Sequence, residues 1–132
     1  MKLTHEQLLC ISEFAKLTGV IPKDCIIGEK ILSFLVEKKQ LGKAIGRRAR
    51  NLRKLEEKTK KRVEVIALTQ DIKDFIREAL KAEPKKLEKN GKRITVTFSP
   101  EDRIKIMKKT AKLKRIKLFA ERNFGVVLLF RY

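Results

Sequence analysis

Apolar residues in the first half of the chain switch between helical and strand spacing. They follow Thr4, a residue type that caps helices, at helical spacing until Gly19 stops the pattern. Apolar residues also suggest one or two helical turns at 41–45, and a stripe at Leu52, Leu55 and Thr59 predicts a helix after Gly46. Short apolar runs typical of strands occupy residues 25–27, 31–36 and 63–68.

The second half shows the same alternation of helical and strand patterns. A helix capped at Thr69 or Asp71 carries its apolar residues on one face, and Ser99-Pro100 is a typical helix start. Helical spacing then continues with no obvious breaker near its middle until Asn123-Phe124-Gly125. The predicted elements of this half are a helix at 72–80, an alternating strand at 93–98, a helix over 103–122 and a final strand at 126–130.

A polar segment at 81–92 predicts a boundary between two small domains. It ends in Asn90-Gly91, a strong hairpin signal, and Leu87 is its only large apolar residue, so any strand before the turn is weak. We therefore expect an α+β chain with a first domain at 1–80, which includes the N-terminal helix, and a second domain at 81–132.

Basic residues are concentrated in two blocks of the chain. The formal net charge of the 132 residues is +18. Residues 38–63 hold 12 basic and 2 acidic side chains, and residues 103–132 hold 10 and 1, while the rest of the chain is close to neutral. A charge of this size and distribution indicates an anionic partner such as nucleic acid.

A short loop, Gly46-Arg47-Arg48, lies inside the first basic block and opens the second predicted helix. Helix N-termini attract anions, and arginine binds phosphate with a planar fork of N–H donors. The loop therefore predicts contact with a sugar-phosphate backbone.

The second basic block repeats the first at an offset of 61 residues. The repeat preserves both the apolar register and the positions of the charges. The matched positions are Ile45 with Ile106, Arg47-Arg48 with Lys108-Lys109, Leu52 with Leu113, Arg53-Lys54 with Lys114-Arg115 and Leu55 with Ile116. We interpret this as an internal duplication.

The motif around the loop resembles the signature of the KH domains of NusA. The matching segment is LGKAIGRRARNLRKLEEKTKKRVEVI; in the family an Ile-Gly-x-x-Gly loop joins two helices, and Asn-aliphatic and a Val-Ile strand follow. Upstream, LTHEQLLCISEFAKLTGVIPKDCI resembles the opening of the short archaeal NusA-like proteins, which consist of two KH domains. The resemblance covers nearly all of the chain and is more specific in the first copy.

The resemblance implies two tandem type II KH domains, each a small three-stranded sheet with helices packed on one face. It also implies an RNA-binding transcription factor that grips single-stranded nascent RNA and affects elongation or termination. In KH domains the loop clamps about four nucleotides. The implied RNA-binding residues are Lys43, Ile45, Gly46, Arg47, Arg48, Ala49, Arg50 and Arg53, with Lys108, Lys109, Lys112 and Lys114 adding electrostatic contacts in the second copy.

The chain departs from the family loop at its last position. Ala49 replaces the second glycine, and because alanine prefers helical φ we expect it to begin the helix. The second copy has neither glycine at Met107–Thr110, so we do not expect a faithful backbone clamp there. Leu52 and Val65 could line a base groove with Ile45, but core packing is the better interpretation for Leu52. Contact with RNA and a solvated face are equally plausible for Lys58, Lys60 and Lys61.

Alternative functions remain open on the sequence alone. The chain could be a module that docks on RNA polymerase or the ribosome, or a general binder of single-stranded nucleic acid. Helix-turn-helix DNA binding is a weaker alternative because strands flank each basic block. We expect no enzyme, cofactor, metal or small-molecule substrate, because the chain has no nucleophile–base set, P-loop or metal-ligand cluster, and His5 stands alone.

Two further expectations concern the location of the protein and its cysteines. No signal peptide is visible and the apolar runs are short, so we expect a cytoplasmic protein without a membrane partner. Cys10 and Cys25 occur in unrelated contexts and should be buried thiols. Low Asn and Gln content with heavy Lys, Arg, Glu and Ile usage is typical of thermophile proteins.

Overall fold

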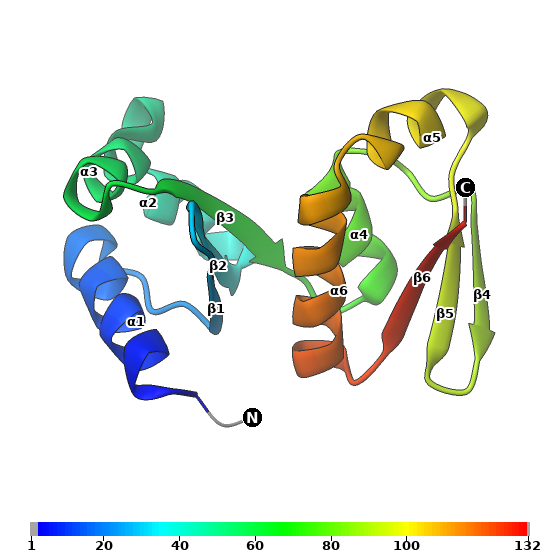
Figure 1. Ribbon diagram of the computed structural model, residues 1–132, viewed down its shortest axis with the longest axis horizontal. Coiled ribbons are helices and arrows are strands. Elements are labelled where there is room, and N and C mark those ends of the chain that lie inside the picture. The colour runs from blue at the N-terminus through cyan, green and yellow to red at the C-terminus, as the bar shows by residue number, and fades with distance from the viewer. Residues whose placement is uncertain (1–2, 132) are drawn as a thin grey trace. The chain divides into compact units, whose positions relative to one another are not determined.

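The computed structural model describes residues 3–131, and the chain forms two compact units, Met1–Leu68 and Thr69–Tyr132. Each unit contains a small three-stranded mixed sheet with helices packed against it (Figure 1). The expected α+β class is therefore confirmed. The order helix, strand, strand, helix, helix, strand occurs in both units, consistent with tandem type II KH domains.

The elements of the first unit agree with the sequence pattern within a few residues. They are helix α1 (His5–Thr18), strands β1 (Asp24–Ile27) and β2 (Ile31–Glu37), the 3-10 turn η1 (Lys38–Gln40), helix α2 (Leu41–Ile45), the 3-10 turn η2 (Arg47–Ala49), helix α3 (Arg50–Thr59) and strand β3 (Arg62–Leu68). Strand β2 is central, antiparallel to β1 and parallel to β3.

Capping residues determine both ends of helix α1. The Thr4 side chain accepts the backbone N–H of Gln7, and the Gln7 side chain accepts the backbone N–H of Thr4, which completes a capping box. At the other end Gly19 has a φ of 76°, a left-handed conformation that glycine adopts without steric cost.

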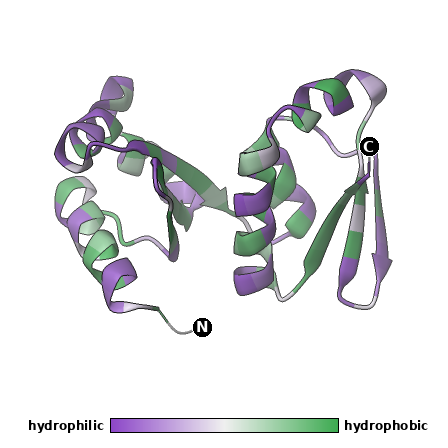
Figure 2. Cartoon of the chain, in the orientation of Figure 1, coloured by the Kyte–Doolittle hydropathy of each residue, from purple (hydrophilic) through white to green (hydrophobic). Residues whose placement is uncertain are grey.

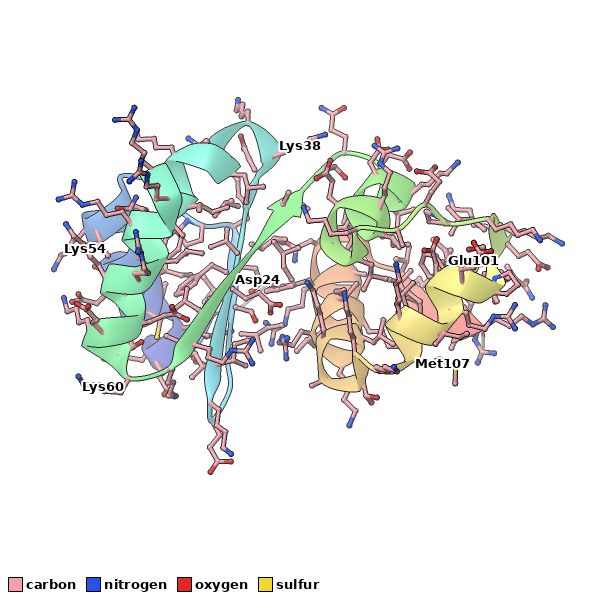
Figure 3. The ribbon with its side chains drawn as sticks, turned by 90° about the horizontal axis from the view of Figure 1, so that it is seen from above. Asp24, Lys38, Lys54, Lys60, Glu101 and Met107 are labelled. Atoms are coloured by element: carbon pink, nitrogen blue, oxygen red, sulfur yellow. The ribbon has the colours of Figure 1, made fainter. Side chains whose placement is uncertain are left out.

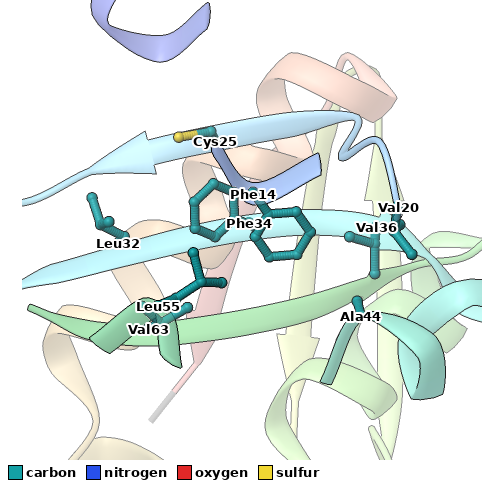
Figure 4. Close-up of a cluster of buried hydrophobic side chains, with 9 residues drawn as sticks. All are labelled: Phe14, Val20, Cys25, Leu32, Phe34, Val36, Ala44, Leu55 and Val63. Carbon is teal, nitrogen blue, oxygen red and sulfur yellow. The ribbon is translucent and has the colours of Figure 1, made fainter. Parts of the chain in front are cut away.

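The core of the first unit lies between its helices and its sheet (Figure 4). The rings of Phe14 in α1 and Phe34 in β2 stack with their centroids 4.2 Å apart. Ala44 from α2 and Leu55 from α3 complete the cluster from the side of the helices. Helix α3 is amphipathic: most of its residues are hydrophilic (Figure 2), and only Leu55 is buried among them.

The second unit repeats this arrangement. Its elements are helix α4 (Ile72–Leu80), strands β4 (Lys86–Asn90) and β5 (Arg93–Thr97), helices α5 (Pro100–Met107) and α6 (Thr110–Phe124), and strand β6 (Val127–Arg131). Strand β5 is central, antiparallel to β4 and parallel to β6. Buried side chains of β5, β6 and α6 form its interior, among them Val96, Ile116 and Leu128.

The helical pattern over 103–122 forms two helices instead of one, separated at the second loop that the internal repeat predicts. Helix α5 ends at Met107, and Lys109 leaves helical geometry with φ −101° and ψ 46° before α6 begins. The backbone N–H of Lys109 donates to the carbonyl of Ile106 at 2.9 Å and closes the turn. The break falls at the position that the internal repeat assigns to the second loop.

The boundary between the units lies earlier than the expected boundary at residue 81. Helix α4 belongs to the second unit, where it contacts α6 and the ring centroids of Phe75 and Phe124 are 5.3 Å apart. The apolar face of α4 was visible in the sequence, but such a face does not reveal which sheet it covers. With α4 included, both units begin with a helix.

Within residues 3–131, no helix combines the length and the apolar character needed to cross a bilayer.

Replacing Phe14 with alanine should lower the free energy of unfolding by about 3–5 kcal/mol, because a large buried ring is lost from the core. Leu8→Ala on the same helix is the control: Leu8 is 50% exposed, so its loss should change stability by no more than about 0.5 kcal/mol. Urea unfolding followed by circular dichroism measures both effects. Equal losses in the two variants would contradict the assigned core.

Candidate nucleic-acid interface

The predicted loop joins α2 to α3 and contains three residues with positive φ. Gly46 has φ 80° and ψ 168°, Arg48 has φ 54° and ψ 35°, and Ala49 has φ 57° and ψ 30°. Helix α3 then begins at Arg50. The loop is therefore a sharp turn with its own backbone conformation, and it does not simply extend either helix.

The loop conformation requires glycine at position 46 for two independent reasons. Its φ lies in the region that only glycine adopts easily, and a Cβ at this position would lie 3.0 Å from Cγ and Nδ2 of Asn51. Asn51 occupies this space because its side-chain N–H donates to the carbonyl of Lys43 at 3.1 Å. The amide of Asn51 thus ties the last turn of α2 to the first turn of α3.

Asn51 was not among the predicted site residues. The signal was present in the sequence, because the family signature has an asparagine and an aliphatic residue after the loop, matched here by Asn51 and Leu52. Its role is to hold the loop in shape, and propensity alone could not indicate this.

The expectation that Ala49 begins the helix is wrong. Ala49 keeps the left-handed conformation that a glycine would adopt, and its backbone N–H donates to the carbonyl of Gly46 at 3.1 Å. A residue with a Cβ pays roughly 1–2 kcal/mol for this conformation. Alanine at this position, where the family signature has glycine, therefore adds strain to the loop and leaves its left-handed turn in place.

The basic side chains around the loop are exposed and lack acidic partners. Within residues 3–131 no ion pair is formed by Lys43, Arg47, Arg48, Arg50 or Arg53. Their charges are thus available to an external anion. Lys54 continues this surface along the outer side of α3 (Figure 3).

Other lysines of the first basic block are used inside the protein. Lys58 pairs with Glu13 of α1, and this contact lowers the pKa of the Glu13 carboxyl. The ammonium group of Lys61 donates to the carbonyl of Gly28 at 2.9 Å. Both residues therefore have structural partners, whereas Lys60 is exposed at the end of α3.

The N-terminus of α3 concentrates positive charge without an acidic cap. No side chain caps this end of the helix, and its first turn contains no acidic residue. Arg47, Arg48 and Arg50 lie instead beside the positive end of the helix dipole. This arrangement is electrostatically unfavourable by itself and becomes favourable when an anion binds.

The three predicted groove residues lie partly buried around the same helix pair. Leu52 and Val65 pack against the core cluster of the first unit, in agreement with the core interpretation for Leu52. Ile45 is half-buried at the end of α2, directly before Gly46.

The corresponding turn of the second unit has a different backbone. Lys108 has φ −76° and Lys109 has φ −101°, and neither adopts the left-handed conformation found in the first loop. Lys108, Lys109 and Lys114 are exposed, and Lys112 is half-buried. The turn therefore carries the predicted charges on a backbone unlike that of the first loop.

Comparison with known proteins relates the chain to archaeal NusA proteins. No protein-family model matches the chain. Over 77 residues it is 34% identical to the "Probable transcription termination protein NusA" of Methanocaldococcus jannaschii and 31% identical to the protein of that name from Methanococcus vannielii. The match covers 58% of this chain but only 42% and 44% of those two proteins, less than half of each.

A solved structure shares the fold of the whole chain. The protein described as "Crystal structure of APE1850" superposes with a TM-score of 0.82 at 28% sequence identity. The superposition covers 98% of this chain and 100% of that chain.

Gly46→Ala should destabilise the protein by about 1–3 kcal/mol, because the new Cβ is strained by the positive φ and meets Asn51. Gly42→Ala in α2 is the matched control. A Cβ at Gly42 has open space, so alanine should leave stability unchanged or raise it by up to about 1 kcal/mol. Thermal unfolding of the two variants distinguishes them, and equal stability would contradict the role of Gly46.

Ala49→Gly should raise the free energy of unfolding by up to about 1 kcal/mol, since glycine removes the left-handed strain but gains entropy in the unfolded chain. Lys81→Gly, at another left-handed position outside the loop, should behave similarly. Urea titration measures both variants. Destabilisation at Ala49 alone would mean that its methyl group makes a contact that outweighs the strain.

Proposed function

We propose that this protein is an RNA-binding factor of transcription that holds the backbone of single-stranded nascent RNA at the loop Gly46–Ala49. The observation that carries the proposal is the coincidence of exposed, unpaired arginines with a left-handed turn at the uncapped N-terminus of α3. Each of these features favours an anion with several oxygen acceptors.

The proposed contacts follow from the chemistry of the loop. Arg47 and Arg48 would each place a fork of N–H donors on phosphate oxygens, while Lys43, Arg50 and Arg53 add positive charge nearby. The N-terminus of α3, which no side chain caps, adds the positive end of the helix dipole beside these side chains. Ile45, half-buried beside the loop, would contact the base next to the phosphate that the loop holds.

The transcriptional part of the proposal rests on the relatives. Two proteins named as probable transcription termination factors match the chain, although the match spans less than half of their length. We further propose that the two compact units are two type II KH domains, with α4 as the first helix of the second domain. A factor acting on nascent RNA would work in the cytoplasm.

The second unit is proposed to contribute mainly electrostatic attraction. Lys108, Lys109, Lys112 and Lys114 surround a turn without a left-handed residue, so they act as point charges for phosphate. Base preference is therefore assigned to the first unit.

A second candidate function, docking on RNA polymerase or the ribosome, is favoured by one feature of the second unit. Ile104 and Met107 in α5 are 61% and 48% exposed and lie among exposed lysines such as Lys108. Apolar side chains ringed by charge are common at protein–protein contacts. On this alternative the basic blocks face an acidic protein surface.

Arg47→Gln combined with Arg48→Gln should weaken binding to labelled single-stranded RNA at least about tenfold at moderate salt. Removing two phosphate contacts should also reduce the slope of log affinity against log salt by about 1.4, since each contact on a single strand contributes about 0.7. Fluorescence anisotropy across a salt series measures both quantities.

Two double variants serve as controls with the same change in net charge. Lys89→Gln with Lys92→Gln alters the exposed hairpin between β4 and β5 and should leave binding nearly unchanged. Lys108→Gln with Lys109→Gln tests the second loop and should cause a smaller loss than the arginine pair. Equal losses of RNA affinity in the three double variants would indicate nonspecific electrostatic attraction, as in a general nucleic-acid binder.

Transcription assays with archaeal RNA polymerase separate the remaining alternatives. If RNA binding is the function, the arginine variant should lose its effect on termination together with its affinity for RNA. Unchanged RNA binding in a correctly folded arginine variant would exclude the loop mechanism and favour docking on the polymerase.

A further inference from the structure

Cys10 and Cys25 belong to the same hydrophobic core region of the first unit, although 15 positions separate them in the sequence. Cys10 packs against the hydrophobic cluster that contains Cys25, and a side-chain contact with Cys25 lowers the pKa of the Cys10 thiol. The sequence had suggested unrelated contexts for the two residues.

Two other contacts hold the face of α1 that carries Cys10 over strands β1 and β2. The Gln7 side chain donates to the carbonyl of Cys25 at 2.8 Å, so this face of α1 lies directly on β1. One turn further along the helix from Cys10, Phe14 stacks on Phe34, which is the β2 partner of Cys25. Cys10 lies between Gln7 and Phe14 on the same face of the helix. Figure 4 shows Cys25 beside the two stacked rings.

The two thiols differ in their access to solvent. Cys25 is fully buried, whereas Cys10 is half-buried and lines a small, partly open cavity between α1 and α3. The cavity has a volume of about 140 Å³, and its other lining residues are Leu9, Glu13, Leu32, Phe34, Leu55 and Thr59. Cys10 is therefore the thiol that a small disulfide reaches first, at the mouth of the cavity.

We propose that Cys10 and Cys25 form a site of reversible disulfide modification, oxidised by a low-molecular-weight disulfide. The Cys10 thiolate attacks one sulfur of that disulfide, whose S–S bond breaks and releases one thiolate. The Cys25 thiol then loses its proton to solvent and attacks Cys10 Sγ, which releases the second thiolate. The protein loses two electrons and two protons, and the small disulfide is reduced to two thiols.

The cross-link would join helix α1 covalently to strand β1. It would close the segment 10–25 into a loop in the unfolded chain, which lowers the entropy of unfolding and stabilises the first unit. The chain composition resembles that of thermophile proteins, the group in which intracellular disulfides are common.

The surroundings of Cys10 control how fast the site reacts. Burial raises the pKa of the Cys10 thiol, Glu6 and Glu13 on α1 raise it further, and Lys61 together with the contact to Cys25 lowers it. Because the thiolate is the nucleophile, oxidation should be slow near neutral pH and should accelerate as the pH rises.

The test is equilibration of the wild-type protein with buffers of reduced and oxidised glutathione, in native conditions and in urea. Alkylation by iodoacetamide and intact-mass measurement then give the fraction of each form. The folded chain should form the intramolecular disulfide with an effective thiol concentration on the order of a hundredfold above that of the unfolded chain. An equal or lower value in the folded state would overturn the proposal.

Two variants test the order of the steps. Folded Cys25→Ala should stop at a single glutathione adduct on Cys10, and folded Cys10→Ala should remain unmodified. Accumulation of a glutathione adduct or of cross-linked dimers in the wild-type protein, without closure to Cys25, would contradict the proposed pair. The wild-type measurement stands even if a variant fails to fold.

Discussion

The parallel pairing of β2 with β3 determines where the cationic loop lies. Two parallel strands cannot be joined by a hairpin, so the chain must cross back over the sheet between them. In the first unit it returns through α2 and α3, which the short turn Gly46–Ala49 joins. The pair β5 and β6 imposes the same path on the second unit. Strand pairing thus fixes the position of the turn in each unit, but it does not fix the residues of the turn, which can differ between the two units.

The two turns have diverged in backbone as well as in charge. In the first, Arg48 and Ala49 hold left-handed conformations, and Asn51 anchors the turn from the side of α3. In the second, no residue of the turn is left-handed. Strain and clustered positive charge both oppose stability, and proteins tend to tolerate such conflicts at functional sites. The loop is held in this shape before any ligand arrives, which reduces the ordering needed on binding.

The sequence predicted the elements with strong apolar periodicity and missed those that depend on distant partners. The apolar run at 31–36 predicted strand β2, and the alternation at 93–98 predicted strand β5. Strand β4 is polar and owes its conformation to pairing with β5. The break at Lys109 is not visible in the helical spacing of apolar residues, which continues across it, and only the internal repeat indicated it. Ala49 could not be predicted from propensity, since its conformation is imposed by the turn around Gly46 and Asn51. The charges of the candidate site were predicted, and its anchoring residue was not.

The capping box of α1 has a consequence for the edge of the first sheet. Strand β1 lies at that edge, where exposed carbonyls could pair with a strand of another molecule. The Gln7 side chain accepts a hydrogen bond from the backbone of Thr4 and, with its amide N–H, occupies the carbonyl of Cys25. One side chain therefore both starts the helix and removes an acceptor from a four-residue edge strand. The helix start thereby makes this edge of the sheet less able to pair with a strand of another molecule.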